Sequence, residues 1–402
     1  MPDGAGRQKT ELDLRIALGQ ALTANRGWGA PELAEIHSRA TELASMLNRP
    51  RALLLALWGQ FMSHYARADL KRARRLAAEL LALGDAAGDV LMQVMGSHAV
   101  GMTCFQLGEF TAGRAYLDKG LVLANPAHRG SIGQQLRVGD ARIQLQIVSS
   151  RLLACFGHLD QALFHSDAAL GEARRLSHSQ TLAAALTAVW ITRWLVRLEP
   201  GSLLQYANEL LASATEHGLG LFRASALVCR GWCLVALRRA DEGISLLTAG
   251  LAGLDELGVV IWRPCILTLL GDGRRMAGQW PAALRYLTEA RRLAEETEDR
   301  WCLAETIRLS GDVLVAMGDR TDAEASYHEA IVIAQEQSAK LWELRAAISL
   351  ARLRHNQGRR AEARDLLAPV YGWFTEGFDA PDLKEAKALL DELGGAECSL
   401  DR

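Results

Sequence analysis

The sequence predicts an all-α fold in which antiparallel helix pairs stack into a right-handed α-solenoid. Half of the 402 residues are hydrophobic, and apolar side chains recur at intervals of three and four, which is typical of amphipathic helices. Only 9 prolines occur, and no alternating segment is bounded by turn dipeptides, so no sheet is expected. A short pattern of small residues recurs about every 40 residues, and such a period indicates a repeat array.

The recurring pattern consists of a turn residue, often glycine, and a small residue five positions later. Most intervals between turn residues are 40 residues, one is 41 and one is 49. The surplus of the long interval falls near residues 124–140, where Pro126 and Gly130 are expected to interrupt a helix. The sequence therefore predicts one insertion in a regular array. The predicted turn residues are Ala68, Gly108, Gly157, Leu198, Arg238, Gly278, Gly318 and Gly358.

A second small residue stands seven positions before most turns, as Gly231 does before Arg238. Small residues on both sides of a turn let the two helices of a pair approach closely, as in tetratricopeptide (TPR) repeats. The usual TPR unit has ~34 residues, so we expect each helix here to be about three residues longer. Because each unit covers its apolar stripe only by stacking, residues 11–393 are expected to form a single TPR-like domain of about nine helix pairs.

The two ends of the array are expected to differ from its middle. Residues 1–10 are predicted to be disordered, and Glu11–Arg26 and Ala30–Leu47 to form a degenerate first pair. Pro381–Leu393 reads as an amphipathic C-terminal capping helix, ended by two glycines. Residues 394–402 are expected to be a flexible tail.

Charge and composition exclude several classes of protein. The 45 basic and 47 acidic side chains give a formal charge of −2, so no overall basic field attracts nucleic acid or a membrane surface. The basic run at residues 71–75 lacks interleaved aromatic side chains, so it is interpreted as a solvated face. No secretory signal or membrane-spanning run is present, and the seven cysteines lack framework spacing. We expect a cytoplasmic protein with reduced thiols.

No residue pattern predicts catalysis, a metal or a cofactor. Cys229 and Cys233 lie one helical turn apart, but two thiols without further ligands are better explained as core residues. His158 and His165 are interpreted as surface residues beside a turn. The string at residues 4–10 lacks the Gly-Lys step of a phosphate loop, and no His-Glu-x-x-His or Gly-x-Ser-x-Gly motif occurs. The sequence therefore predicts a protein that is not an enzyme.

The first helix of each TPR pair normally lines the concave face, where peptides or partner helices bind. Counting back from the turns gives candidate groove positions that are apolar in the early repeats and charged in the late ones. They suggest a protein or peptide partner with an apolar end and an acidic end. The candidate groove residues are Leu55, Trp58, Met62, Tyr65, Met95, His98, Met102, Phe105, Trp232, Asp272, Arg275, Glu305, Arg308, Asp312, Arg345, Arg352, His355 and Asn356.

Two alternatives remain open at this point. The early groove residues could instead pack against the neighbouring pair, because longer helices shift the register of the TPR rule. Counting back from the turn residue Leu198 places Trp190 and Trp194 at positions that face the core of the helix pair. Packing therefore explains these two tryptophans better than ligand binding does. The oligomeric state and the identity of the partner do not follow from the sequence.

Two parts of the chain resemble a known family. One is residues 343–393, which include the stretch from Gly358 to Asp379, and the other is residues 11–49, which include Arg26 to Glu32. They resemble the C-terminal TPR region, of the MalT-like kind with a repeat of ~40 residues, of bacterial STAND-type ATPase regulators. Proteins of that family are often fused to adenylate or guanylate cyclase domains. The resemblance implies a non-catalytic sensor or interaction arm, present here without the ATPase. The alternatives are the regulatory C-terminal portion of a multidomain cyclase and a freestanding peptide-responsive TPR receptor.

Overall fold

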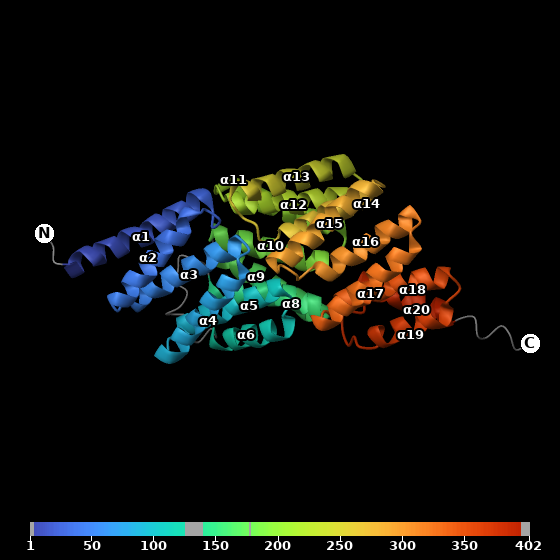
Figure 1. Ribbon diagram of the computed structural model, residues 1–402, viewed down its shortest axis with the longest axis horizontal. Helices are drawn as coiled ribbons and strands as arrows, with labels where there is room; N and C mark the ends of the chain where they lie inside the picture. Colours follow the sequence, from blue (N-terminus) through green and yellow to red (C-terminus); the bar gives the residue numbers. More distant parts are fainter. Residues whose placement is uncertain (1–3, 125–139, 177, 395–402) are drawn as a thin grey trace, which may run out of the picture.

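The computed structural model describes residues 4–124, 140–176 and 178–394, and this part of the chain contains nineteen α-helices and no strand (Figure 1). The helices form successive antiparallel pairs, followed by one last helix, so the solenoid fold is confirmed. In the first half these are α1 (Gly4–Arg26), α2 (Glu32–Met46), α3 (Pro50–Ala66), α4 (Leu70–Ala87), α5 (Val90–Leu107), α6 (Phe110–Leu123), α8 (Ala141–Phe156) and α9 (Leu159–Leu176). The others are α10 (Ser179–Leu195), α11 (Pro200–Glu216), α12 (Gly220–Ala236), α13 (Ala240–Glu256), α14 (Arg263–Met276), α15 (Trp280–Thr297), α16 (Leu303–Met317), α17 (Arg320–Glu336), α18 (Lys340–Asn356), α19 (Arg360–Tyr371) and α20 (Pro381–Gly394).

The ends of the array differ from the expected bounds at one place. Helix α1 begins at Gly4, so residues 4–10, which were expected to be disordered, are helical. These residues add about two turns to the helix. The sequence has no N-terminal capping signal that would have marked its start. Helix α20 coincides with the predicted capping segment, and most of the predicted insertion and tail lie outside the described residues.

Left-handed backbone at single residues ends the helices and sets the period. Ala68, Gly108, Gly157, Arg238 and the three later turn glycines all have positive φ, as the turn pattern requires. The predicted turn at Leu198 is wrong by one residue, because the left-handed residue is Arg197, with φ of 57°. Arginine lacks the freedom of glycine there, which is why this turn has no clear sequence signal.

The small residues on either side of a turn bring paired helices into backbone contact. A Cβ atom on Gly231 of α12 would lie 2.7 Å from the carbonyl oxygen of Gly243 on α13. A Cβ on Gly243 would meet the carbonyl of Gly231 at 2.5 Å. Neither position accepts a larger side chain without moving the two helices apart, so the pattern read from the sequence does reflect close packing.

The solenoid completes one turn, and its second turn stacks on the first. The carbonyl oxygen of Ala66, at the end of α3, accepts hydrogen bonds from the N–H groups of Val260 (2.7 Å) and Ile261 (3.0 Å). One repeat later the carbonyl of Gln106 accepts from Arg300 (2.7 Å) and Trp301 (3.2 Å). Carbonyls at the ends of helices lack intrahelical partners, so the second turn provides partners for them.

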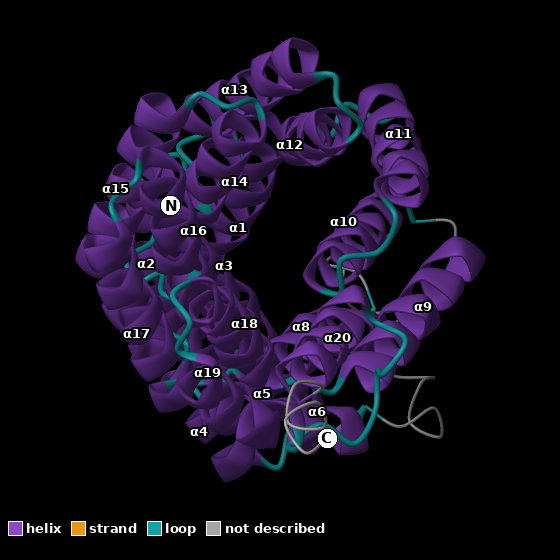
Figure 2. Cartoon of the chain, turned by 90° about the vertical axis from the view of Figure 1, so that its right-hand side faces the viewer, coloured by secondary structure: helices purple, strands orange, loops and turns teal. Residues whose placement is uncertain are grey.

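The contact between turns continues to the C-terminus. Arg345 of α18 donates to the carbonyl of Leu195 and, at 2.9 Å, to Asp382 of α20. Asp382 is fully buried and also accepts from Arg197 at 2.7 Å. Seen end-on, helices of both turns form a continuous ring (Figure 2). The protein is therefore a closed superhelix rather than an open arc.

Candidate binding cavity

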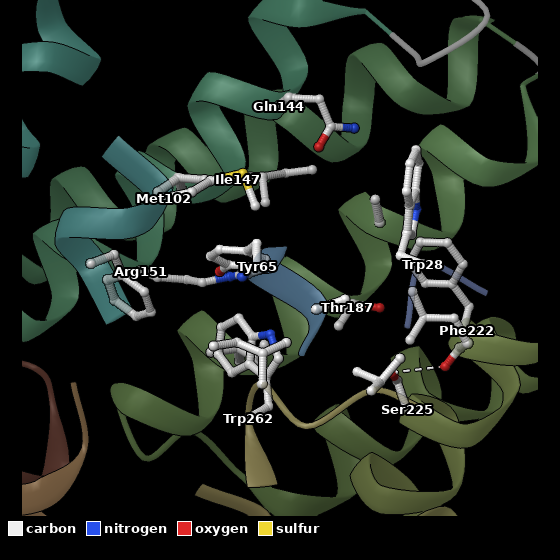
Figure 3. Close-up of a pocket in the computed structure, with 18 of the residues that line it drawn as sticks. Trp28, Tyr65, Met102, Gln144, Ile147, Arg151, Thr187, Phe222, Ser225 and Trp262 are labelled. Carbon is white, nitrogen blue, oxygen red and sulfur yellow. Dashed lines mark hydrogen bonds between the residues drawn. The ribbon is translucent and has the colours of Figure 1, made fainter. Parts of the chain in front are cut away.

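The ring encloses a cavity of about 280 Å³ between the first helices of the early pairs and the second turn. Its walls come from α3, α5, α8, α10 and α12 on one turn and from residues 259–269 and Trp301 on the other. Figure 3 shows side chains from these elements converging on the same space. Many of the wall residues are aromatic or contain sulfur, namely Trp28, Trp58, Met62, Tyr65, Met95, Met102, Phe105, Trp190, Trp194, Phe222, Cys229, Trp262, Cys265 and Trp301.

The apolar groove positions predicted for the early repeats lie together at this cavity. The seven that line it are Trp58, Met62, Tyr65, Met95, His98, Met102 and Phe105. Leu55 lines an adjoining hollow of about 410 Å³. The hollow and the cavity share Trp28, Trp58, Gln180, Leu221, Phe222 and Val259. The two spaces are therefore contiguous around these shared side chains.

Counting back from the turn residues of α8 and α10 identifies further wall residues, which are absent from the predicted groove set. Measured from Gly157, the groove positions of α8 are Gln144, Ile147, Arg151 and Ala154, and the first three line the cavity. Measured from Arg197, those of α10 are Ala184, Thr187, Ile191 and Trp194, and these also line it. Counting from Leu198 instead shifts every position by one residue. That shift is why Trp194 was assigned to the core.

Trp190 and Trp194 are nonetheless extensively packed. Their rings stack 6.3 Å apart with planes inclined by 4°, and both residues are buried. The indole N–H of Trp190 donates to the sulfur of Cys233 at 3.3 Å. The two tryptophans therefore pack against neighbouring side chains and also line the cavity. Trp232, a predicted groove residue, lies edge-on to both rings and donates to Asp272 at 3.4 Å, but it does not line the cavity.

Arg151 is the charged group in the cavity wall. Its guanidinium carbon lies 5.1 Å from the ring centre of Trp262, and its Nε is buried without a hydrogen-bond partner among the described residues. Burial lowers the pKa of Arg151 to about 10, so the group remains charged at pH 7. Burial also raises the pKa values of Tyr65 and Cys229, so neither neutralises it.

Two further titratable groups lie near this wall. Burial, and the charge of Arg151, lower the pKa of His98 to about 3, so the imidazole is neutral and stacks on Trp58 at 5.6 Å. Asp299 is held by hydrogen bonds to neighbouring groups. It accepts from the Gln106 side-chain amide at 3.2 Å and from the Trp262 backbone N–H at 3.0 Å. Burial raises the pKa of Asp299 to about 7.

The charged groove positions of the late repeats are paired with one another. Arg275 bonds Asp272 at 2.7 Å, and Arg308 lies between Glu305 and Asp312, at 2.7 Å from each. Arg345 contacts Glu305 and Asp382, as part of the contact between turns. Arg352, His355 and Asn356 lie farther out, where Arg352 pairs with Glu385 and His355 with Glu392. Most of the charge predicted to bind an acidic partner is thus neutralised within the protein.

The residues weighed for metal binding or catalysis do not assemble into a site. Cys229 and Cys233 are buried thiols, and His158 and His165 are half-buried beside their turn. In the described part of the chain, no three His, Cys, Asp or Glu side chains are placed to hold a metal ion. Within the same residues, none of the helices has both the length and the apolar character that a membrane crossing requires.

Comparisons with known proteins agree with the fold. No protein-family model matches the sequence. An uncharacterized protein of Rhizobium meliloti (strain 1021) is 24% identical over 347 residues, covering 84% of this chain and 33% of that protein. This chain thus spans about a third of the relative's length.

Among solved structures, a Rap protein complexed with competence and sporulation factor is similar with a TM-score of 0.54 at 14% identity, over 85% of this chain and 96% of that one. A STAND protein with a tetratricopeptide repeat sensor from Pyrococcus horikoshii gives 0.42 at 15% identity, over 90% of this chain and 54% of that one. At such low identity, the likeness to the Rap protein shows a shared helical-repeat fold.

Proposed function

We propose that this chain is a non-catalytic binding scaffold, the sensor or interaction arm of a STAND-type signalling or transcriptional regulator. It binds a protein or peptide partner on the inner surface of the superhelix, at the hollow beside Leu55. The proposal rests on the observation that the apolar groove residues of successive early repeats face one unfilled space, which continues into the hollow beside Leu55. Apolar side chains around an unfilled space are the usual basis of a binding site.

The length of the Rhizobium relative supports the interpretation as an arm. Its similarity to this chain covers only a third of that protein, so a related sequence occurs within a longer polypeptide. A regulatory portion of a multidomain cyclase is compatible with the same observation. A freestanding peptide-responsive receptor would use the same inner surface.

A matched pair of variants tests the binding surface. Leu55→Arg places a charge in the outer hollow, whereas Leu14→Arg makes the same change at a side chain that is 65% exposed on α1. Each purified chain would capture proteins from the native extract, and the captured partner would then be purified and titrated. We expect Leu14→Arg to bind it like wild type and Leu55→Arg to bind at least tenfold more weakly. Equal affinity of the three proteins would refute binding at this surface.

A further inference from the structure

The strongest unexplained feature of the molecule is the charge of Arg151 inside an aromatic cavity. A guanidinium presents five N–H donors, and stacking on Trp262 satisfies none of them as a hydrogen bond does. The side chain is half-buried, and its Nε is buried without a hydrogen-bond partner among the described residues. Buried charges in proteins are ordinarily paired, because an unpaired charge loses its hydration without compensation. The missing partner of Arg151 is therefore expected to be a ligand.

The position of Arg151 sets the charge that the ligand must carry. Its side chain reaches from α8 toward Tyr65 within the group of wall residues (Figure 3). Asp299 makes no ion pair with it; the Asp299 oxygens accept hydrogen bonds from the Gln106 side chain and the Trp262 backbone. His98 is neutral and brings no second positive charge. One guanidinium in an otherwise uncharged wall matches one carboxylate, which it can bind through two parallel N–H donors.

The rest of the wall sets the shape and polarity of the ligand body. Around Arg151 the wall consists mostly of apolar or aromatic side chains, such as Met102, Ile147 and Trp262. An extended peptide here would bring an N–H and a C=O group with every residue, and the wall offers few partners for them. Gln144 and Gln180 line it, but the hydroxyls of Thr187 and Ser225 already donate to carbonyls of their own helices. A hydrocarbon or aryl body needs none, and it gains from contact with tryptophan rings.

We propose that the inner cavity is a site for a small amphipathic carboxylic acid, whose apolar body lies among the tryptophans and whose carboxylate pairs with Arg151. This site goes beyond the proposed partner surface, which lies at the outer hollow around Leu55. Because the cavity is walled by both turns of the superhelix, the bound acid bridges them. A small acid then acts as an effector that stabilises the closed form of the scaffold.

The test uses the full chain and two probes of the same ten-carbon length, decanoate and decan-1-ol, of which only the first is charged. Binding is measured by isothermal titration calorimetry. We expect wild type to bind decanoate at one site, ten- to a hundredfold more tightly than the alcohol, as charged hydrogen bonds of this kind imply. Arg151→Met should abolish that preference while leaving the affinity for the alcohol unchanged, and Arg151→Lys should retain part of it. Arg223→Met, the same change at an exposed residue of α12, should behave like wild type.

Three outcomes would overturn the proposal. Equal affinity of wild type for the acid and the alcohol would do so, and that comparison needs no variant to fold. A preference for decanoate that survives in Arg151→Met would place the acid elsewhere. Trileucine binding more tightly than decanoate, with a loss on C-terminal amidation, would assign the site to a peptide end. Failure of the acid to bind leaves the Leu55→Arg result unaffected, so the two proposals fail separately.

Discussion

The carbonyl oxygen of Ala66 accepts a hydrogen bond of 2.7 Å from the backbone N–H of Val260, although the two residues lie on different turns of the superhelix. The same bond recurs one repeat later between Gln106 and Arg300. Stacked repeats otherwise contact only their sequence neighbours, so these bonds add long-range contacts that an open solenoid lacks. They also place Trp262 and Trp301 against the inner surface of the first turn, which closes the cavity.

Asp382→Ala is expected to be strongly destabilising. The carboxylate is fully buried and receives bonds from Arg345 at 2.9 Å and Arg197 at 2.7 Å, so its loss leaves the buried Arg345 short of a partner. Removing one member of such a buried pair costs about 3–5 kcal/mol. Urea unfolding would measure the loss, with Asp379→Ala as the control, since Asp379 is exposed and pairs only with Lys384. A cost for Asp382→Ala as small as that of the control would show that the turns are not joined here.

Gly29→Ala is expected to separate the turns at the N-terminal end. A Cβ at this position would lie 2.0 Å from the carbonyl oxygen of Gly258 on the second turn. Backbone must move to accommodate it, at a cost of about 1–3 kcal/mol or more. Gly201→Ala is the matched control in α11, because nothing lies within 4 Å of the added atom. Thermal unfolding should show a lower Tm for the first variant and an unchanged or higher Tm for the second.

Asp299 should make stability depend on pH. Burial raises its pKa to about 7, whereas the group titrates near 4 in an unfolded chain. Between these values the folded state binds one more proton than the unfolded state, so its stabilising contribution is present at low pH and falls as pH rises through 7. Between pH 5 and pH 8, wild type should lose about 2 kcal/mol relative to Asp299→Asn in urea unfolding. Parallel pH profiles of the two proteins would contradict this assignment.

Two arginines that the sequence placed in one charged groove should behave differently. Arg308 is nearly buried between Glu305 and Asp312, whereas the side chain of Arg352 is 56% exposed beside Glu385. Arg308→Ala removes the closest cationic partner of both Glu305 and Asp312 and is expected to cost about 3–5 kcal/mol, against less than about 1 kcal/mol for Arg352→Ala. Urea unfolding at equal salt measures both values. Similar costs would mean that the late groove is solvated rather than neutralised within the protein.

The repeat length and the helical pairs could be predicted from the sequence because they depend on local signals, such as Gly108 and Gly318 at left-handed turns. The turn at Arg197 has no such signal, and an error of one residue there assigned Trp194 to the core rather than the cavity wall. Closure of the ring could not be predicted, because it depends on small rotations between repeats that add up over a full turn.

The pairing of the charged groove depends on the same long-range arrangement. Arg345 bonds with the Leu195 carbonyl and Asp382, which are distant in sequence, so only the folded chain shows that it is not available to a ligand. Arg151, by contrast, stands at the groove position six residues before Gly157. It could have been found by applying the counting rule to every repeat.

The central claim is that the second turn closes on the first to form a cavity that binds a ligand. Hydrogen exchange at the amides of Val260 and Trp301 tests it most directly, because their partners are the first-turn carbonyls of Ala66 and Gln106. We expect both amides to be protected in the free protein, and to exchange still more slowly with decanoate in wild type but not in Arg151→Met. Exchange at the rate of an exposed loop, or protection that decanoate leaves unchanged, would contradict the claim.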